Sequence, residues 1–180
     1  MTEGGEIPIK DGWRGRFYED FEVGDVYQHA IGKTVTESDN EWFTLLTLNT
    51  QQSHFNVEYA RRIEFGRILV NSTFTLALVT GLTVSDISQN VIANLGWDEV
   101  RLPHPVFIGD TIWAESMVLS TRESRSRPKA GLVTVKTRGL NQDGKECIKF
   151  KRTILVNKRS EAGSLDAFPK AERPIQSDEP

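Results

Sequence analysis

The chain has 180 residues, carries a formal net charge of −3, and is 38% hydrophobic and 26% charged. This length suits one domain of ordinary size, and the composition is that of a globular protein with its own core. The net charge gives no general attraction to nucleic acid, and the single cysteine excludes an internal disulfide framework. The N-terminus lacks an apolar signal core and no apolar run is long enough to span a bilayer, so we expect a cytoplasmic protein without membrane contact.

The first expected segment is a Gly-rich polar arm at residues 1–16, which either docks on the domain or stays mobile. Farther along, Thr36 to Asp39 has the Ser/Thr-x-x-acidic form of a helix N-cap, and apolar residues follow at helical spacing. This pattern predicts a short helix. At the other end, residues 159–180 are polar and contain three prolines, so we expect no packed element in this tail.

A long buried helix is predicted from Ile68 to Leu82, where apolar residues occupy most positions. A helix that is apolar nearly all round is buried rather than exposed. Several of these residues are β-branched, so propensity alone leaves a strand open. The length of the run, and the absence of Gly or Pro between Gly66 and Gly81, decide for a helix.

Turn signals divide the second half of the chain into four predicted strands, at residues 97–106, 111–121, 131–141 and 145–157. In the last strand apolar and polar residues alternate, which is typical of a sheet with one buried face. The last two strands are expected to pair across the Asn-Gln-Asp-Gly turn between them. An early strand is predicted near residues 26–35.

These elements together predict an α+β fold in which one antiparallel sheet covers one long buried helix. A single sheet of this kind leaves an edge and part of the helix uncovered. Because an uncovered edge is a site for pairing with another chain, a homodimer or a dimer of dimers is the expected unit.

The most informative stretch of the sequence is the polar loop that leads into the predicted helix. The loop carries Asn49 and His54, and Asn71 lies near the start of the helix. An imidazole titrates near neutrality and can both take and return a proton. Free backbone N–H groups at a helix start can hold a developing negative charge. The stretch therefore predicts an active site built around an oxyanion.

Three separated motifs, at residues 21–25, 49–72 and 101–111, resemble those of the MaoC-like dehydratases and (R)-specific enoyl-CoA hydratases of the hot-dog fold. The resemblance covers about residues 17–156. On the second motif His54 matches the catalytic His of the family. Asn49 stands where the family has a catalytic Asp, and Asn71 stands where it usually has a His.

The resemblance implies a hot-dog domain at residues 17–158, in which the antiparallel sheet wraps around the long helix. It also implies a hydro-lyase that adds or removes water across the 2,3-double bond of an enoyl-CoA thioester. Coenzyme A is then part of the substrate, and no other cofactor is expected. The motif variants look more like the branch that handles branched C5 dicarboxylyl-CoA esters. Itaconyl-CoA is the first choice of substrate, with mesaconyl-CoA and β-methylmalyl-CoA close behind.

On this interpretation His54 is the general base that activates a water molecule. A carboxamide does not ionise at physiological pH, so Asn49 would accept a hydrogen bond from that water, and Asn71 would contact the same water or the substrate. Other interpretations stay open. Asn49 could be a loop or cap residue, or it could mark lost activity in a non-catalytic acyl-CoA-binding subunit. A thioesterase of the same fold would need a carboxylate or an activated water at the carbonyl carbon.

Further residues are expected to bind the substrate. The backbone N–H groups of Ser72 and Thr73 could meet the thioester oxygen, and Ser72 could equally be the N-cap of the helix. Thr80 and Gly81 match the family's Ser-Gly at the inner end of the acyl pocket, or else serve close helix–sheet packing. A distal carboxylate in that pocket needs a cation. The candidates are Arg62, Arg67 and Arg101.

The densest basic cluster, at residues 122–129, is either a solvated loop or a grip for the phosphates of coenzyme A. Its candidate residues are Arg125, Arg127 and Lys129. His29 and His104 are isolated in the sequence and have no partners at metal-ligand spacing, so no metal site is expected. The chain also lacks G-x-S-x-G, P-loop and G-x-G-x-x-G motifs, which excludes serine hydrolases, nucleotide hydrolases and Rossmann dehydrogenases.

Overall fold

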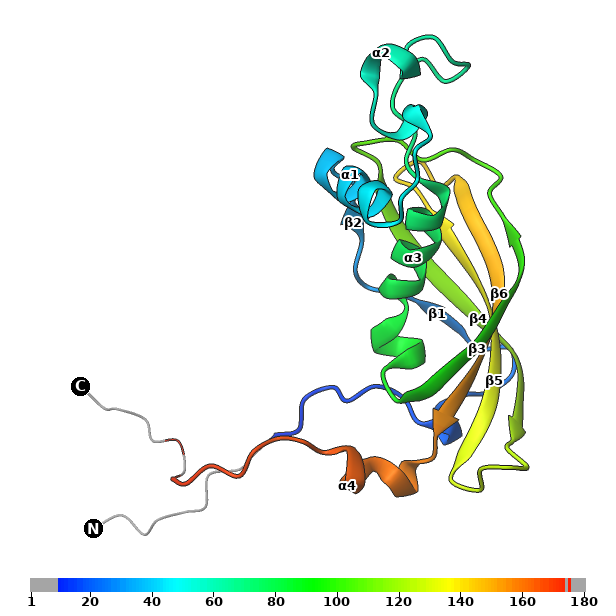
Figure 1. Cartoon of the computed structure of the whole chain (residues 1–180). Coiled ribbons are helices and arrows are strands. Elements are labelled where there is room, and N and C mark those ends of the chain that lie inside the picture. Colours follow the sequence, from blue (N-terminus) through cyan, green and yellow to red (C-terminus); the bar gives the residue numbers. More distant parts are fainter. Residues whose placement is uncertain (1–9, 174, 176–180) are drawn as a thin grey trace.

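The computed structural model describes residues 10–173 and residue 175. Its centre is an antiparallel sheet with the strand order β1-β4-β5-β6-β3, and β2 also pairs with β4. Figure 1 shows the sheet curving along one side of the helix α3. The strands are β1 (Val26–Gln28), β2 (Lys33–Thr34), β3 (Val91–Arg101), β4 (Thr111–Glu123), β5 (Ala130–Leu140) and β6 (Glu146–Asn157).

The predicted strands are confirmed, with shifted bounds. Strands β5 and β6 pair as expected across the turn at residues 141–144, where Gly144 takes a positive φ of 73°. Strand β3 begins six residues before its predicted start and ends at Arg101, because the prolines at positions 103 and 105 cannot donate to a ladder. The single early strand is in fact two short strands, β1 and β2.

The predicted helix is confirmed as α3 (Ser72–Leu82), but it starts later than predicted, and Thr75 and Val79 are its only buried residues in this chain. Leu69 instead forms a bridge with Phe107, and the N–H of Val70 donates to the carbonyl of Val106. The β-branched residues before the helix favour this extended form, so tertiary pairing decides where the helix begins. Gly139 lets α3 approach the sheet, because a Cβ there would lie 2.6 Å from Val79 Cγ2.

The short helix α1 (Glu37–Leu46) confirms the predicted cap. Thr36 accepts a hydrogen bond from the N–H of Asp39, and the Asp39 carboxylate accepts one from the N–H of Thr36. Phe43 of α1 packs edge-on against Phe74 of α3, with ring centroids 5.5 Å apart. The helix α1 therefore rests on the start of α3 rather than directly on the sheet (Figure 1).

Several large apolar side chains remain uncovered by the described part of this chain. On α1 and just after it they are Trp42, Leu45, Leu46 and Leu48, and on the edge strand β3 they are Ile92, Leu95 and Trp97. Apolar surface of this extent on a helix and a sheet edge is typical of an interface. It fits the expected homodimer, which stays a prediction.

The inner face of the sheet carries two apolar clusters. The first apolar cluster lies beside α3 and consists of Val35, Val70, Val79, Val106, Ile112, Ala114, Cys147, Ile148 and Phe150. The second apolar cluster lies beside η3 (Val84–Ser88), the π-helical continuation of α3, and consists of Phe21, Ile87, Val118, Val133, Val135, Ile154 and Val156. Each central strand contributes residues to one or both clusters, so both belong to the same sheet.

A row of buried polar side chains, which we call the polar row, separates the two clusters. Its members are Ser116 on β4, Thr137 on β5, Arg152 on β6, Thr83 after α3, and His29. Ser116 lies between Ala114 of the first cluster and Val118 of the second, as its place on the strand requires. The row was not predicted from the sequence, because its members come from separate segments that the fold brings together.

His29, which stands alone in the sequence, is hydrogen-bonded on both ring nitrogens in the structure. Its Nδ1 lies 2.9 Å from Asp86 Oδ2 and its Nε2 lies 3.0 Å from Ser116 Oγ. The carboxylate can only accept, so Nδ1 donates to Asp86 and Nε2 accepts from the serine hydroxyl. Burial lowers the pKa of His29, and Asp86 opposes this shift. His29 is therefore a structural, hydrogen-bonded histidine.

The described part of the N-terminal arm docks on the domain. Trp13 Nε1 donates to the carbonyl of Ser85 at 3.0 Å, and Arg16 pairs with Asp86 at 2.9 Å. The rest of the predicted arm, residues 1–9, lies outside the described residues, as do residues 174 and 176–180 of the tail.

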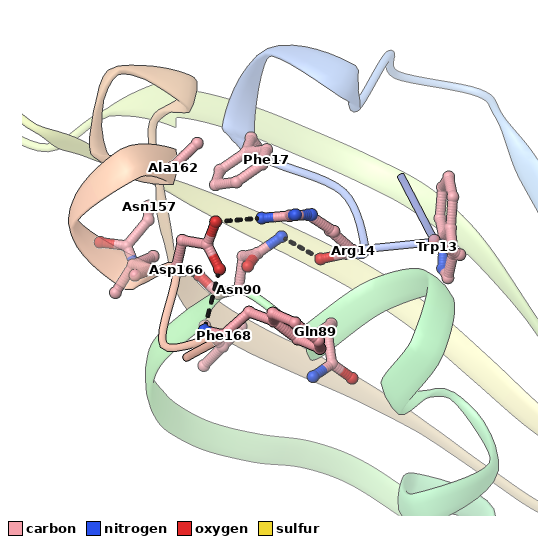
Figure 2. A pocket seen from close by; sticks show the side chains of 12 residues that line it. Trp13, Arg14, Phe17, Gln89, Asn90, Asn157, Ala162, Asp166 and Phe168 are labelled. Carbon is pink, nitrogen blue, oxygen red and sulfur yellow. Dashed lines mark hydrogen bonds and ion pairs between the residues drawn. The ribbon is translucent and has the colours of Figure 1, made fainter. Parts of the chain in front are cut away.

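The tail contains the short helix α4 (Ala162–Leu165), none of whose residues is buried, so the expectation that it forms no packed element stays a prediction. Asp166 beyond α4 pairs with Arg14 of the arm at 2.9 Å. Arm and tail line an open cavity of about 620 Å³, and Figure 2 shows the Arg14–Asp166 pair within it. None of the described helices is long and apolar enough to cross a bilayer.

Candidate functional site

His54 ends the 3₁₀ turn η2 (Gln52–His54) and is 9% exposed. Its Nδ1 lies 2.8 Å from the carbonyl oxygen of Leu69, just before α3. A carbonyl oxygen only accepts hydrogen bonds, so Nδ1 carries the proton of the neutral ring. The lone pair of the neutral imidazole is therefore on Nε2, and this atom is ready to take a proton.

Asn40 of α1 ties the His54 turn to the start of α3. Its Nδ2 donates to the carbonyl of His54 at 2.7 Å, and its Oδ1 accepts from the N–H of Asn71 at 2.8 Å. The side chain is fully buried. We did not identify Asn40 from the sequence, where the only signal was its helical spacing of four residues from Thr44, which is also buried. Asn40 fixes the position of the two segments that carry the site.

We expect Asn40→Ala to lower the free energy of unfolding by about 1–3 kcal/mol, because it leaves a buried carbonyl and a buried N–H without partners. Denaturant unfolding followed by circular dichroism measures this loss. The matched control is Ser38→Ala on the exposed side of the same helix, which should change stability by less than about 0.5 kcal/mol. Equal stabilities of the two variants would contradict the bridging role.

The helix cap is Asn71, not Ser72. Asn71 Oδ1 accepts from the backbone N–H of Thr73 at 3.0 Å and from its hydroxyl at 2.7 Å, while Nδ2 donates to Thr44 Oγ1 at 3.2 Å. Since the N–H of Thr73 is already engaged, its expected contact with a thioester oxygen is wrong. Ser72, which is exposed, presents the first backbone N–H of α3. The expected contact of Asn71 with water or substrate stays a prediction.

Asn49 lies half-buried in the loop between α1 and η2. Its Oδ1 accepts from the N–H of Gln51 at 3.1 Å, which is an Asx turn, and Leu48 before it takes a positive φ of 54°. These contacts support the interpretation of Asn49 as a loop residue. Its expected contact with the nucleophilic water stays a prediction.

A cavity of about 200 Å³ opens at the start of α3. It is lined by Phe65, Leu69, Val70, Ser72, Thr75, Leu102, His104, Pro105 and Val106. The second and third sequence motifs therefore meet here, next to the turn that His54 ends, since Leu69 holds the imidazole. His104 was expected to be isolated, but it is one of the lining residues. The larger cavity in Figure 2 is lined by the arm and tail and holds none of the predicted site residues.

The structure places none of the three candidate arginines in a buried pocket. Arg62, Arg67 and Arg101 are all exposed. The guanidinium of Arg67 lies 3.6 Å from the centre of the Phe107 ring, and Arg101 donates to the carbonyl of Val100. Their expected role as the buried partner of a carboxylate therefore finds no support. The fully buried arginine is Arg152, which we did not single out from the sequence.

Thr80 and Gly81, expected at the inner end of the acyl pocket, have different surroundings in the structure. A Cβ at Gly81 would meet nothing within 4 Å, so the expectation that this glycine serves close helix–sheet packing is wrong. Thr80 Oγ1 is buried and has no hydrogen-bond partner among the described residues. A role for either residue at the end of an acyl pocket stays a prediction.

The basic cluster lies far from His54 in the same chain. Arg125, Arg127 and Lys129 are exposed in the β4–β5 hairpin, and Lys129 pairs with Glu161 at 2.9 Å. Strand β4 starts beside the site and has 13 residues, so the hairpin is about 40 Å away. Figure 1 shows it at the opposite end of the sheet from α2 (Val57–Ala60). A grip by this hairpin on coenzyme A bound to the same chain is therefore wrong.

Within residues 10–173 and 175, no three His, Cys, Asp or Glu side chains come together as a metal site would require. The site instead consists of an imidazole with a fixed tautomer, a helix N-terminus and a small apolar cavity. This combination can take a proton from water and stabilise an oxyanion.

Comparison with known proteins places this site in a family. The sequence model of the mesaconyl-CoA hydratase family matches residues 10–176. The chain is 38% identical over 153 residues to a mesaconyl-CoA hydratase of Cereibacter sphaeroides, covering 85% of this chain and 44% of that protein. It is 34% identical over 145 residues to a beta-methylmalyl-CoA dehydratase of Chloroflexus aurantiacus, covering 81% and 41%. The chain thus spans somewhat under half the length of these curated relatives.

Among solved structures, the MaoC-like dehydratase of Rhodospirillum rubrum superposes with a TM-score of 0.71 at 30% identity. The match covers 81% of this chain and 99% of that one. The predicted α+β hot-dog fold, a sheet wrapped around a long helix, is confirmed. The chain belongs to the mesaconyl-CoA hydratase family of MaoC-like, hot-dog proteins.

Proposed function

We propose that this chain is a hydro-lyase that adds or removes water across the 2,3-double bond of a C5 dicarboxylyl-CoA thioester. The observation that carries the proposal is the fixed tautomer of His54, whose Nδ1 is bonded to the Leu69 carbonyl and whose Nε2 can act as a base. The names of its relatives favour mesaconyl-CoA and β-methylmalyl-CoA as the substrate pair, ahead of itaconyl-CoA, the first choice from sequence.

In the hydration direction, the thioester oxygen lies at the N-terminus of α3, near the backbone N–H of Ser72. His54 Nε2 takes a proton from water, and the resulting hydroxide adds to the β-carbon. The electron pair of the double bond moves toward the thioester, and the helix N-terminus stabilises the enolate oxygen. The imidazolium then returns its proton to the α-carbon, so the hydroxyl group and the proton of one water are added to the same face of the double bond.

A panel of acyl-CoA esters tests the proposal. Purified protein is incubated with mesaconyl-, itaconyl- and crotonyl-CoA, and the products are separated by liquid chromatography and identified by mass. We expect hydration of mesaconyl-CoA at the highest kcat/KM. Release of free coenzyme A from several esters would instead indicate a thioesterase. Binding of the esters without turnover would indicate a non-catalytic subunit.

The role of Asn49 is tested by two substitutions. We expect Asn49→Ala to lower kcat by about fivefold, because the loss of one hydrogen bond to the water removes about 1 kcal/mol. Asn49→Asp keeps an acceptor for the Gln51 N–H and should retain turnover. Steady-state kinetics with mesaconyl-CoA measures both. If Asn49→Ala loses only stability and keeps its kcat, Asn49 is a loop residue alone.

A further inference from the structure

Arg152 is a buried arginine and the member of the polar row that carries a full charge. It lies on the inner face of β6 between Phe150 of the first apolar cluster and Ile154 of the second, and it is 1% exposed. Its Nη2 donates to Thr83 Oγ1 at 3.0 Å. Its Nε and Nη1 have no hydrogen-bond partner in the described part of the chain. Two nitrogen atoms of this buried guanidinium therefore lack a hydrogen-bond acceptor among the described residues.

The charge of Arg152 is also unbalanced. None of its side-chain atoms lies within 4.0 Å of a carboxylate in the described residues, whereas other arginines of the chain, such as Arg138, do form ion pairs. Burial lowers the pKa of Arg152 to about 10, which still leaves the guanidinium charged at neutral pH. A buried charge without a partner lowers the stability of the folded protein, so a bound anion would be stabilised at this position.

A second buried polar atom without a partner in the described part of the chain, Thr80 Oγ1, belongs to a residue one helical turn before Thr83. Thr83 donates its hydroxyl to the carbonyl of Thr80 at 2.7 Å, which leaves its oxygen free to accept from Arg152. Thr80 precedes Thr83 by three residues, so the two side chains share one face of the helix. Thr80 Oγ1 is buried and lacks a partner among the described residues. Thr83 thus contacts both described residues that carry unpartnered buried atoms, Thr80 of α3 and Arg152 of β6.

The distance from the start of α3 to Thr80 suits the length of a dicarboxylyl group. Thr80 is eight residues beyond Ser72, about 12 Å along the helix axis. Hydrogen bonds of about 2.9 Å at both ends leave about 6 Å between the two oxygens of the ligand. That is roughly the separation of the outer oxygens of an extended four-carbon chain with a carbonyl at each end. A dicarboxylyl thioester held at the N-terminus of α3 would therefore extend its far carboxylate toward Thr80 and Arg152.

We propose that Arg152 and Thr80 form the subsite for the distal carboxylate of the acyl group. The proposal rests on the proposed function. It names the residues that would select a dicarboxylyl-CoA ester over a simple enoyl-CoA ester. A guanidinium and a hydroxyl are suitable donors for a carboxylate, and the carboxylate in turn supplies the charge that the buried arginine lacks.

The test compares kcat/KM for mesaconyl-CoA and crotonyl-CoA, which lacks the distal carboxylate. We expect Arg152→Met to lower kcat/KM for mesaconyl-CoA roughly 100- to 1,000-fold, since it would leave the substrate charge buried without its partner. Crotonyl-CoA should be hydrated as well as before or better. The matched control is Arg138→Met on the neighbouring strand β5, an exposed arginine paired with Glu115, which should leave both values unchanged.

Two further variants separate binding from folding. Arg152→Lys keeps the charge and should retain part of the preference for mesaconyl-CoA. Thr80→Val keeps the shape of the side chain and should lower the preference roughly tenfold or more, as expected for one hydrogen bond to a charged group. Thermal unfolding of every variant, with and without sodium chloride, shows whether each one folds and whether a small anion occupies the same place.

Three outcomes would overturn the proposal. If the wild type prefers mesaconyl-CoA and Arg152→Met keeps that preference, the subsite is wrong while the proposed function stands. If chloride raises the Tm of the wild type but not of Arg152→Met, and the substrate preference is unchanged, the site holds an inorganic anion only. If the wild type hydrates crotonyl-CoA and never mesaconyl-CoA, the dicarboxylyl substrate fails and the subsite fails with it.

Discussion

His54→Ala is expected to lower kcat for the hydration of mesaconyl-CoA by about 10²–10⁴-fold, the range typical of general acid–base catalysis. The physical reason is that the hydrogen bond from Nδ1 to Leu69 leaves the Nε2 lone pair of His54 free to take a proton from water and return it. Asn49 cannot take its place, because a carboxamide does not ionise. Steady-state kinetics with the purified variant measures the loss.

Two companion variants make this result specific. His54→Gln keeps a polar side chain of similar size and should be as inactive as His54→Ala. Gln52→Ala changes an exposed residue of the same turn and should keep near-native turnover. Circular dichroism and the Tm show that the variants are folded. Near-native turnover of His54→Ala would show that another residue is the base.

Phe150→Ala is expected to lower the free energy of unfolding by about 3–5 kcal/mol. Phe150 is 1% exposed and lies on β6 in the first apolar cluster, so its removal leaves a cavity that the surrounding strands cannot fill. From the sequence, Phe74 and Leu78 of α3 would have been chosen for this test. The structure shows both as only partly buried against that cluster.

Chemical denaturation followed by fluorescence or circular dichroism measures the loss. Lys149→Ala is the matched control, because its side chain lies on the other face of the same strand and pairs with Glu146 near the surface. We expect that control to change stability by less than about 0.5 kcal/mol. A loss of less than 1 kcal/mol for Phe150→Ala would contradict the assignment of the sheet's inner face.

The elements with regular patterns were predictable from sequence. The alternation along β6 and the turn at residues 141–144 predict the pairing of β5 with β6, and the apolar run predicts α3. The start of α3 was not predictable, because it depends on Leu69 pairing with Phe107, which lies 38 residues away in the chain. A local pattern carries no information about such a contact.

The site was predictable only in part, for a similar reason. The motif around His54 identifies the base, but the hydrogen bond that sets its tautomer comes from Leu69, and the support comes from Asn40. Arg152 could have been found, because it occupies an inward-facing position in the alternation of β6. Arginine is almost never fully buried without a partner, so an exposed position was the natural expectation.

The polar row has a consequence for how the molecule tolerates change. Apolar clusters accept volume-conserving apolar substitutions at a cost of less than about 1.5 kcal/mol. In the polar row, Ser116 is hydrogen-bonded to both His29 and Thr137, so an apolar residue there would leave buried polar groups without a partner. The two clusters can therefore vary in sequence more freely than the polar row between them.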